Sequence, residues 1–237
     1  MAEKENLHAG HRQRVKNRIR RSGLDDMDDH QVLEAILFFA LPRVDTNELA
    51  HRLLRRFRTL FGVFEASPEE LKEIPGIGDN AALLLNMIPG ISRRYLLSKV
   101  VTSTRLMDTA SVGNLLKPYF IGKTEEHVYL LGLDSRRAPI SCELIHKGSV
   151  NAIQVSISKI VSEALRMKAA AVVLAHNHPG GIAIPSNEDV RTTLKVRDAL
   201  RAVNITLLDH IVVADPMETS DLSGAFVSLA DSGLLMR

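Results

Sequence analysis

The chain has 237 residues, enough for one large or two small domains, and its 45% hydrophobic and 24% charged residues have the balance of a soluble globular protein. The net charge of +2 does not indicate a nucleic-acid-binding protein, and Cys142, the single cysteine, excludes an intramolecular disulfide and a cysteine-rich zinc site. The longest apolar runs are far shorter than a membrane span and no secretory signal opens the chain, so we expect a cytoplasmic protein without membrane contact.

Charge is unevenly distributed near the start of the chain. Residues 11–21 (HRQRVKNRIRR) carry six Lys/Arg and no acid, whereas residues 25–29 (DDMDD) carry four acids. The basic run can contact phosphate, or it can form the solvated face of a first helix that pairs with the acidic turn after it. We favour the second interpretation, because short charged runs usually lie on the surface.

Helical periodicity dominates the first part of the chain. Apolar side chains recur three and four positions apart, which indicates a buried face on each of several helices. They are Val32, Leu33, Ile36, Leu37 and Phe39, followed by Leu49, Leu53, Leu54 and Phe57. One of residues 45–47 (Asp-Thr-Asn) can cap the second of these helices, and Ser67 followed by Pro68 has the form of another helix start. We therefore predict an all-helical N-terminal domain over residues 1–99.

A Gly-Ile-Gly turn interrupts the helical pattern within residues 71–85 (LKEIPGIGDNAALLL). Gly76 and Gly78 supply backbone conformations that other residues resist, and they expose N–H groups at a helix N-terminus, where a phosphate can bind. The stretch resembles the helix-hairpin-helix motif, which contacts DNA backbones without reading sequence. Asp79 follows the second glycine, where DNA-binding examples usually carry a basic or small residue, and its carboxylate would repel a phosphate. Non-specific DNA contact and a hairpin used for packing alone therefore both remain open.

The pattern changes near residue 100 to short apolar runs, most of them rich in β-branched residues, which predict strands. The runs are residues 128–133 (VYLLGL), 139–144, 170–175 (AAVVLA) and 205–214 (ITLLDHIVVA). Helical stretches at residues 157–168 and 187–203 separate the last three runs. Such alternation indicates a three-layer α/β (α+β) domain whose sheet is covered by helices. We place this domain at residues 105–237, with the join around residues 100–108.

The stretch LAHNHPGGIAIPSNEDV, residues 174–190, is the main candidate for a functional site. His176 and His178 are two apart at the end of an extended strand, so both rings point to one side and their nitrogens can share a cation. A Pro-Gly-Gly break ends the strand, and Asp189 lies one turn into the helix that Ser186 opens, on the same side. Two histidines and one carboxylate leave a tetrahedral Zn²⁺ one open position for water, as in catalytic sites, where the metal activates the water and polarises a carbonyl.

Each part of this pattern has a purely structural alternative. Ser186 and Asp189 have the spacing of a capping box, a role that leaves the second carboxylate oxygen free for a metal. A single histidine near a strand end is more often structural than a ligand. Two histidines at this spacing, followed by a glycine break and Ser-x-x-Asp, are much rarer by chance, so we interpret the stretch as a metal site.

The pattern His-x-His-Pro followed by Ser-x-x-Asp resembles the JAMM signature of the JAB/MPN metalloproteases. The wider stretch, with ELIHKGS, LAHNHPGG, TLLDHIVVAD and the closing FVSLADSGLL, is similar to the bacterial RadC family from about residue 105 to residue 235. The helical region, from GHRQRVKNRI through the Gly-Ile-Gly turn, is similar to RadC proteins as well. The resemblance implies a helical region followed by a JAB/MPN domain with a three-layer, cytidine-deaminase-like sheet. It also implies hydrolysis of peptide or isopeptide bonds by zinc-activated water.

The resemblance carries over to individual residues. The zinc ligands that it implies are His176, His178 and Asp189. Ser186 would hydrogen-bond the tetrahedral oxyanion, as donors do where charge develops. Active JAMM enzymes also use a glutamate as general acid/base, and its place just before the first strand of the α/β domain (EEHVYLLGL) favours Glu126. The alternatives are Glu125 and Glu143.

Two positions depart from the RadC pattern. Gly180 stands where the family usually carries Ser after HNHP. Residues 156–159 (SISK) stand where the family tends to show His-Pro-Arg-Glu, so that Lys159 replaces an acid. The zinc ligands are intact, but if that acid serves the chemistry or a substrate contact, the chain is a divergent or weakened member.

Three residues near these motifs receive other interpretations. His210, beside Asp209 on an apolar strand, is predicted to pair with that carboxylate, and a role in supporting the metal ligands is left open. Asn177 points to the face opposite the two histidines and is predicted to fix the loop. Cys142 is predicted to be an ordinary buried small residue.

The sequence therefore predicts a cytoplasmic zinc metallohydrolase that acts on a peptide or protein substrate. The alternative is a binding module, in which the helix-hairpin-helix region attaches to DNA and the metal domain is a platform without turnover. A nuclease that uses the same metal is less favoured, because phosphodiester cleavage often uses two metals and these residues supply ligands for one.

Overall fold

The computed structural model describes residues 10–98, 106, 108–148, 156–179, 182–214 and 226–236. The chain divides into two compact units, Met1–Ile91 and Ser92–Arg237. The join predicted at residues 100–108 lies, apart from Leu106 and Asp108, outside the described residues, so its position stays a prediction. In the part of the chain that is described, no helix has the length and apolar character needed to cross a bilayer.

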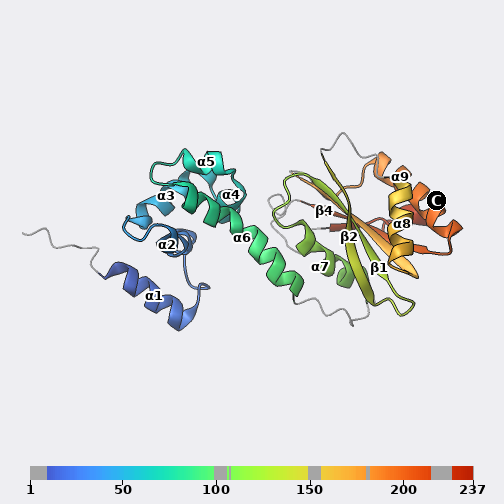
Figure 1. Ribbon diagram of the computed structural model, residues 1–237, viewed down its shortest axis with the longest axis horizontal. Coiled ribbons are helices and arrows are strands. Elements are labelled where there is room, and N and C mark those ends of the chain that lie inside the picture. Colours follow the sequence, from blue (N-terminus) through green and yellow to red (C-terminus); the bar gives the residue numbers. More distant parts are fainter. Residues whose placement is uncertain are drawn as a thin grey trace, which may run out of the picture. The chain divides into compact units, whose positions relative to one another are not determined.

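The first unit is helical, as the apolar periodicity predicts (Figure 1). Its helices are α1 (His11–Ser22), α2 (Asp29–Ala40), α3 (Thr46–Phe57), α4 (Leu60–Glu65), α5 (Pro68–Lys72) and α6 (Asp79–Ser98), the last of which continues into the second unit. The buried side chains of one core include Leu33, Leu37, Leu49, Leu53, Leu71 and Leu85. Phe39 is the exception among the periodic residues, because its side chain is mostly exposed and lies under the ammonium of Lys16.

Two predicted helix starts are present in the structure. The Asp45 carboxylate accepts a hydrogen bond from the backbone N–H of Asn47 (3.0 Å), so Asp45 is the N-cap of α3. Ser67 caps α5 with Pro68 in the first turn, and Glu70 completes the capping box by accepting from the Ser67 backbone N–H (2.8 Å).

The basic run forms the predicted helix, α1, and Arg18 contacts the acidic turn as predicted, but through a backbone carbonyl and not a carboxylate, whereas Arg12 contacts the segment after α2. Arg12 donates to the backbone carbonyls of Leu41 and Pro42, each at 2.7 Å. Arg18 donates to the carbonyl of Asp26 and to the Gln31 side chain. A guanidinium has five donors in a fork, and here they satisfy carbonyls at the ends of neighbouring segments instead of carboxylates.

The Gly-Ile-Gly turn joins α5 to α6 as a helical hairpin. Gly76 has φ +100°, and a Cβ at this position would lie 2.9 Å from Cδ2 of Leu49, so both backbone conformation and packing require glycine. A Cβ at Gly78 would meet nothing within 4 Å. Asp79 begins α6, and its carboxylate lies 3.1 Å from the Lys72 ammonium. These contacts account for the hairpin as a packing element, and DNA contact stays a prediction.

The second unit contains a mixed five-stranded sheet (Figure 1). The strands are β1 (Glu126–Leu133), β2 (Pro139–Gly148), β3 (Ala171–His178), β4 (Thr206–Ala214) and β5 (Phe226–Ser228), in the order β2-β1-β3-β4-β5. β3 and β4 are parallel, and the other neighbours are antiparallel. The four longer strands coincide with the predicted runs. β5 has three residues and carries too short a pattern to be recognised as a strand.

Helices cover both faces of this sheet, which confirms the three-layer prediction (Figure 1). α8 (Ile157–Arg166) and α9 (Asn187–Ala202) pack on one face, and α7 (Thr109–Phe120) packs on the other. The first interface includes Val128, Leu130, Val172 and Leu174 of the sheet with Ile160, Ala164, Val196 and Leu200 of the helices. The second includes Leu131, Val173 and Ile211 with Val112 and Leu116. The sequence interpretation missed α7, although Asp108 caps it and apolar residues follow at helical spacing.

Burial on both faces explains the near-continuous apolar sequence of β3. Val172 and Leu174 belong to the core under α8 and α9, while Val173 and Ala175 belong to the core under α7. Continuing this alternation sends the side chains of residues 176 and 178 toward the α9 face and that of residue 177 toward the opposite face.

Gly113 of α7 offers a stability test of this packing. A Cβ at Gly113 would lie 2.3 Å from Cζ of Phe226, far inside contact distance, so Gly113→Ala is expected to cost about 1–3 kcal/mol through overpacking, despite the better helix propensity of alanine. Urea unfolding measures the change. In a Phe226→Ala background the same substitution should become neutral or stabilising. An equal cost in both backgrounds would mean that the ring is not the obstacle.

Candidate metal centre

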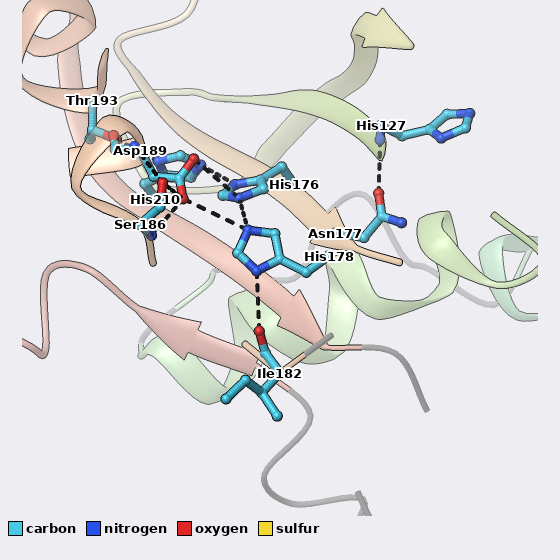
Figure 2. Close-up of polar contacts among 9 residues, drawn as sticks. All are labelled: His127, His176, Asn177, His178, Ile182, Ser186, Asp189, Thr193 and His210. Carbon is cyan, nitrogen blue, oxygen red and sulfur yellow. Dashed lines mark hydrogen bonds and ion pairs between the residues drawn. The ribbon is translucent and has the colours of Figure 1, made fainter. Parts of the chain in front are cut away.

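Two histidines at the end of β3 form the centre of the site. His176 is buried, with 2% of its surface exposed, and His178 is partly exposed where the strand emerges. Their Nε2 atoms lie 2.9 Å apart. Figure 2 shows both rings on one side of the sheet, as residues two apart on a strand must be.

Asp189 reaches the histidines from the first turn of α9 (Figure 2). Its Oδ1 lies 3.5 Å from His176 Nε2, and its Oδ2 lies 3.7 Å from His178 Nε2. Ser186 is the N-cap of α9, and its backbone N–H and hydroxyl both donate to Asp189 Oδ2 at 2.7 Å. The capping box is therefore present, and it fixes the carboxylate while Oδ1 stays free of these bonds.

The protonation of His178 can be inferred from its partner. Its Nδ1 lies 3.1 Å from the carbonyl oxygen of Ile182, which can only accept, so Nδ1 carries the hydrogen and Nε2 of the neutral ring has a lone pair. That lone pair faces another imidazole nitrogen and a carboxylate. A cation is the group that such an arrangement of acceptors attracts.

The spacing of these atoms also suits one metal ion. Ligand atoms about 2.0–2.1 Å from a tetrahedral zinc lie roughly 3.3 Å from one another. The separations of 2.9, 3.5 and 3.7 Å among the three side chains bracket that value. The residues present therefore fit a divalent cation such as Zn²⁺.

The electrostatics of the three groups agree with a site for positive charge. Burial lowers the pKa of His176 to about 4, so its ring is neutral. The neighbouring Asp189 carboxylate favours the protonated ring and raises the pKa of His178. Burial acts to raise the pKa of Asp189, but the contacts with both histidines and with Ser186 outweigh it and hold the pKa well below its usual range.

Glu126 joins the histidines from the first residue of β1. Val128 pairs with His176 across the sheet, so Glu126, two residues earlier, lies on the same face. A carboxylate oxygen of Glu126 and one nitrogen each of His176 and His178 lie within 4.8 Å of one another, and these three residues form a candidate metal-binding group. Glu126 is buried, its Oε1 has no hydrogen-bond partner among the described residues, and burial raises its pKa to about 7.

The two alternative glutamates lie elsewhere. The Glu125 carboxylate is half exposed and lies 3.4 Å from the Lys147 ammonium. Glu143 lies 3.0 Å from the guanidinium of Arg166. Of the three candidates, Glu126 alone is placed with the histidines.

Asn177 holds the backbone on both sides of Glu126. Its side chain points away from the two histidines and accepts from the backbone N–H of His127 at 2.8 Å (Figure 2). It also donates to the carbonyl of Glu125 at 3.2 Å. The amide thus binds the two peptide groups that flank Glu126. Sequence reasoning placed Asn177 on this face but assigned it to the loop, whereas its partner is the neighbouring strand.

The predicted pairing of His210 with Asp209 is wrong. His210 Nε2 lies 2.8 Å from His176 Nδ1, and His210 Nδ1 lies 2.5 Å from Thr193 Oγ1 (Figure 2). The Asp209 carboxylate accepts instead from the Ser228 hydroxyl (2.6 Å) and from the backbone N–H groups of Ala230 and His210. Adjacent residues of a strand point to opposite faces, so the two side chains cannot pair. Nothing in the sequence marks Thr193, which lies seven residues after Ser186.

The remaining predicted positions are less informative. Gly180 lies outside the described residues. The Lys159 ammonium donates to the carbonyl of Ile145 in β2, which ties the start of α8 to the sheet. The Ser186 hydroxyl donates to Asp189, and its proposed oxyanion role stays a prediction. Cys142 is only partly exposed, and burial raises its pKa to about 12, so the thiol is unreactive.

Comparisons with known proteins agree with this architecture. A family model described as a RadC-like JAB domain matches residues 106–234. This segment contains the five strands of the sheet and the candidate site residues Glu126, His176, His178 and Asp189. Two UPF0758 proteins, from Bordetella parapertussis and Bordetella bronchiseptica, are each 34% identical to this chain over 220 residues, which are 93% of this chain and 94% of the relative. Their names state no activity.

Proposed function

The chain belongs to the RadC family, and from that premise we propose that it is a zinc-dependent hydrolase of the JAMM type, which cleaves peptide or isopeptide bonds in the cytoplasm. The observation that supports the proposal most is the convergence of His176, His178 and Asp189 beside a buried glutamate whose Oε1 has no partner among the described residues. The zinc ligands would be these two histidines and the aspartate. When bound there, Zn²⁺ would supply Lewis acidity, which lowers the pKa of a water and polarises a carbonyl.

Glu126 would move the proton in this reaction. With a pKa raised by burial to about 7, its carboxyl group can both accept and donate a proton near neutral pH, which is what a general acid/base requires. It would take a proton from the attacking water and return it to the leaving nitrogen. Its Oε1 is available for this, because no described group already binds it.

Ser186 would stabilise negative charge on the substrate oxygen. Its hydroxyl lies at the exposed start of α9, next to the carboxylate of Asp189. To donate to an oxyanion, the hydroxyl has to exchange its bond to Asp189 for one to the substrate. Asp189 would keep the Ser186 backbone N–H as a donor during this exchange.

The proposal is tested with zinc-loaded protein and quenched fluorescent libraries of peptides and lysine-linked isopeptides. Cleavage by the wild type that falls to background in Asp189→Ala would support the hydrolase. Asp198→Ala is the matched control, since Asp198 is an exposed aspartate of the same helix paired with Arg197. Cleavage that survives in Asp189→Ala would contradict the proposal, because a contaminating hydrolase would then explain it.

DNA attachment by the first unit is the second candidate function. The observation in its favour is the open space at Gly78, at the N-terminus of the 20-residue helix α6. The carboxylate of Asp79 stands against it. A gel shift with duplex DNA at increasing salt tests this function. Binding that weakens steeply as salt rises would indicate phosphate contacts and support DNA attachment.

The Asn177 amide gives a prediction about turnover. In Asn177→Ala the two peptide groups beside Glu126 lose their side-chain partner, so the carboxylate is expected to shift and kcat to fall about 10- to 100-fold. Zinc content should stay at the wild-type level, since the ligands are untouched. Asn17→Ala, an exposed asparagine of α1, is the control. Wild-type kcat in Asn177→Ala would show that the backbone places Glu126 without the amide.

A further inference from the structure

A chain of hydrogen bonds runs behind the candidate metal ligands. It starts at Nδ1 of His176, which lies 2.8 Å from Nε2 of His210 on β4. His210 Nδ1 lies 2.5 Å from the hydroxyl of Thr193 on α9, and this hydroxyl donates at 2.6 Å to the backbone carbonyl of Asp189. His176, His210 and Thr193 are all buried. Figure 2 shows the three side chains in a row that leads back to the start of α9.

The last acceptor determines the direction of every bond in the chain. A backbone carbonyl only accepts, so the single hydroxyl hydrogen of Thr193 points to Asp189. The Thr193 oxygen can then only accept from His210, which places the His210 hydrogen on Nδ1. A neutral His210 has a lone pair on Nε2, and it therefore accepts from Nδ1–H of His176. This leaves the lone pair of His176 on Nε2, the atom that faces His178 and Asp189.

We propose that Thr193 and His210 are positioning residues that hold His176 in the tautomer with its hydrogen on Nδ1 and so present the Nε2 lone pair to a metal ion. The inference rests on the proposed metal centre. It assigns a task to two residues that lie outside the JAMM pattern, and it explains why a buried strand carries a histidine whose imidazole does not pair with the adjacent aspartate.

His176 is the buried one of the two histidines, and the partner of its Nδ1 is a side chain and not a backbone carbonyl. His178, at the strand end, donates directly to a loop carbonyl, that of Ile182. Nδ1 of His176 instead faces the imidazole of His210, which by itself can serve as donor or acceptor. The threonine removes this ambiguity. Because the chain ends on the backbone of Asp189, it also links two proposed ligands that come from β3 and α9.

Removing the Thr193 hydroxyl should allow His210 to adopt its other tautomer. In Thr193→Val, which keeps the shape of the side chain, His210 has no acceptor at Nδ1 and can carry its hydrogen on Nε2 instead. That hydrogen would donate to Nδ1 of His176, whose own hydrogen would then sit on Nε2 and oppose metal binding. Thr193→Ser keeps the hydroxyl and should keep the wild-type arrangement.

The first measurement is the zinc dissociation constant, obtained by competition with a chromophoric chelator. Supporting residues of this kind typically change metal affinity about 10- to 100-fold, so Thr193→Val is expected to bind zinc weaker by that factor while Thr193→Ser stays close to the wild type. Equal affinity in Thr193→Val and wild type would overturn the inference and leave the proposed hydrolase standing.

The second measurement needs no variant and no metal. Imidazole nitrogen NMR of the metal-free wild type, at a pH where His176 and His210 are neutral, reports which nitrogen of each ring carries the hydrogen. Hydrogen on Nδ1 of both rings supports the inference, and hydrogen on Nε2 of either ring overturns it. A wild type that binds no zinc would refute the proposed function, whereas the NMR result would still decide the tautomer.

Discussion

Replacing Glu126 with glutamine is expected to lower kcat by about 10²- to 10⁴-fold, the usual contribution of a general acid/base. Glutamine has the shape of glutamate but cannot take a proton from water. The substitution also removes a buried ionisable group whose Oε1 has no partner among the described residues, so the fold should tolerate it. Zinc content, measured by elemental analysis, should remain at the wild-type value, because the proposed ligands are unchanged.

The neighbouring glutamates provide matched controls. Glu125→Gln and Glu143→Gln remove carboxylates that pair with Lys147 and Arg166 at the surface, so both variants should keep the wild-type kcat. A loss of zinc in Glu126→Gln would identify Glu126 as a fourth ligand. That result would contradict a catalytic centre with a position open for water, since structural zinc sites are closed by four protein ligands.

The parts of the fold that followed from the sequence are those governed by local patterns. The strands β1, β2, β3 and β4 are each eight or more residues long, and each contains apolar residues that mark it as a strand. The caps at Asp45 and Ser67 depend on residues within three positions of the helix start, so the sequence contains the whole interaction. β5 has three residues, and its pairing with β4 depends on the sheet already present.

The arrangement of the site was predictable for a related reason. His176 and His178 share a face because a strand has a period of two, and Asp189 faces them because Ser186 fixes the first turn of α9. The resemblance to JAMM proteins indicated that a glutamate was needed, and the position just before the first predicted strand favoured Glu126. The observed pairing of β1 with β3 then places Glu126 on the face of the two histidines. The chemical roles of these residues stay predictions.

The contacts behind the ligands could not be predicted, because they join segments far apart in the sequence. His210 and Asp209 are neighbours in the chain, and sequence proximity suggested a pair, but the strand sends them to opposite faces. Thr193 meets His210 only because α9 packs over β4. A single sequence holds no signal for such a contact, since a threonine in a helix is ordinary.

Zinc removal is expected to lower the unfolding temperature of the second unit, since the ion binds a ligand set that exists only in the folded chain. A metal present at 100 times its dissociation constant stabilises a fold by about 2.7 kcal/mol. For a protein of this size that corresponds to a Tm shift of roughly 5–10 °C, at about 2–4 °C per kcal/mol. Calorimetry before and after treatment with a chelator measures the shift.

His178→Ala separates this effect from a general action of the chelator. The variant loses a partly exposed imidazole whose main contacts are the other proposed ligands and the Ile182 carbonyl, so its metal-free Tm should stay near that of the metal-free wild type. Its zinc content should fall from one equivalent to none, and added zinc should no longer raise its Tm. His51→Ala, a histidine of α3 that stacks on His30, should keep both responses. An undiminished zinc response in His178→Ala would mean that the stabilising ion lies elsewhere, because two remaining side chains could not hold it with comparable affinity.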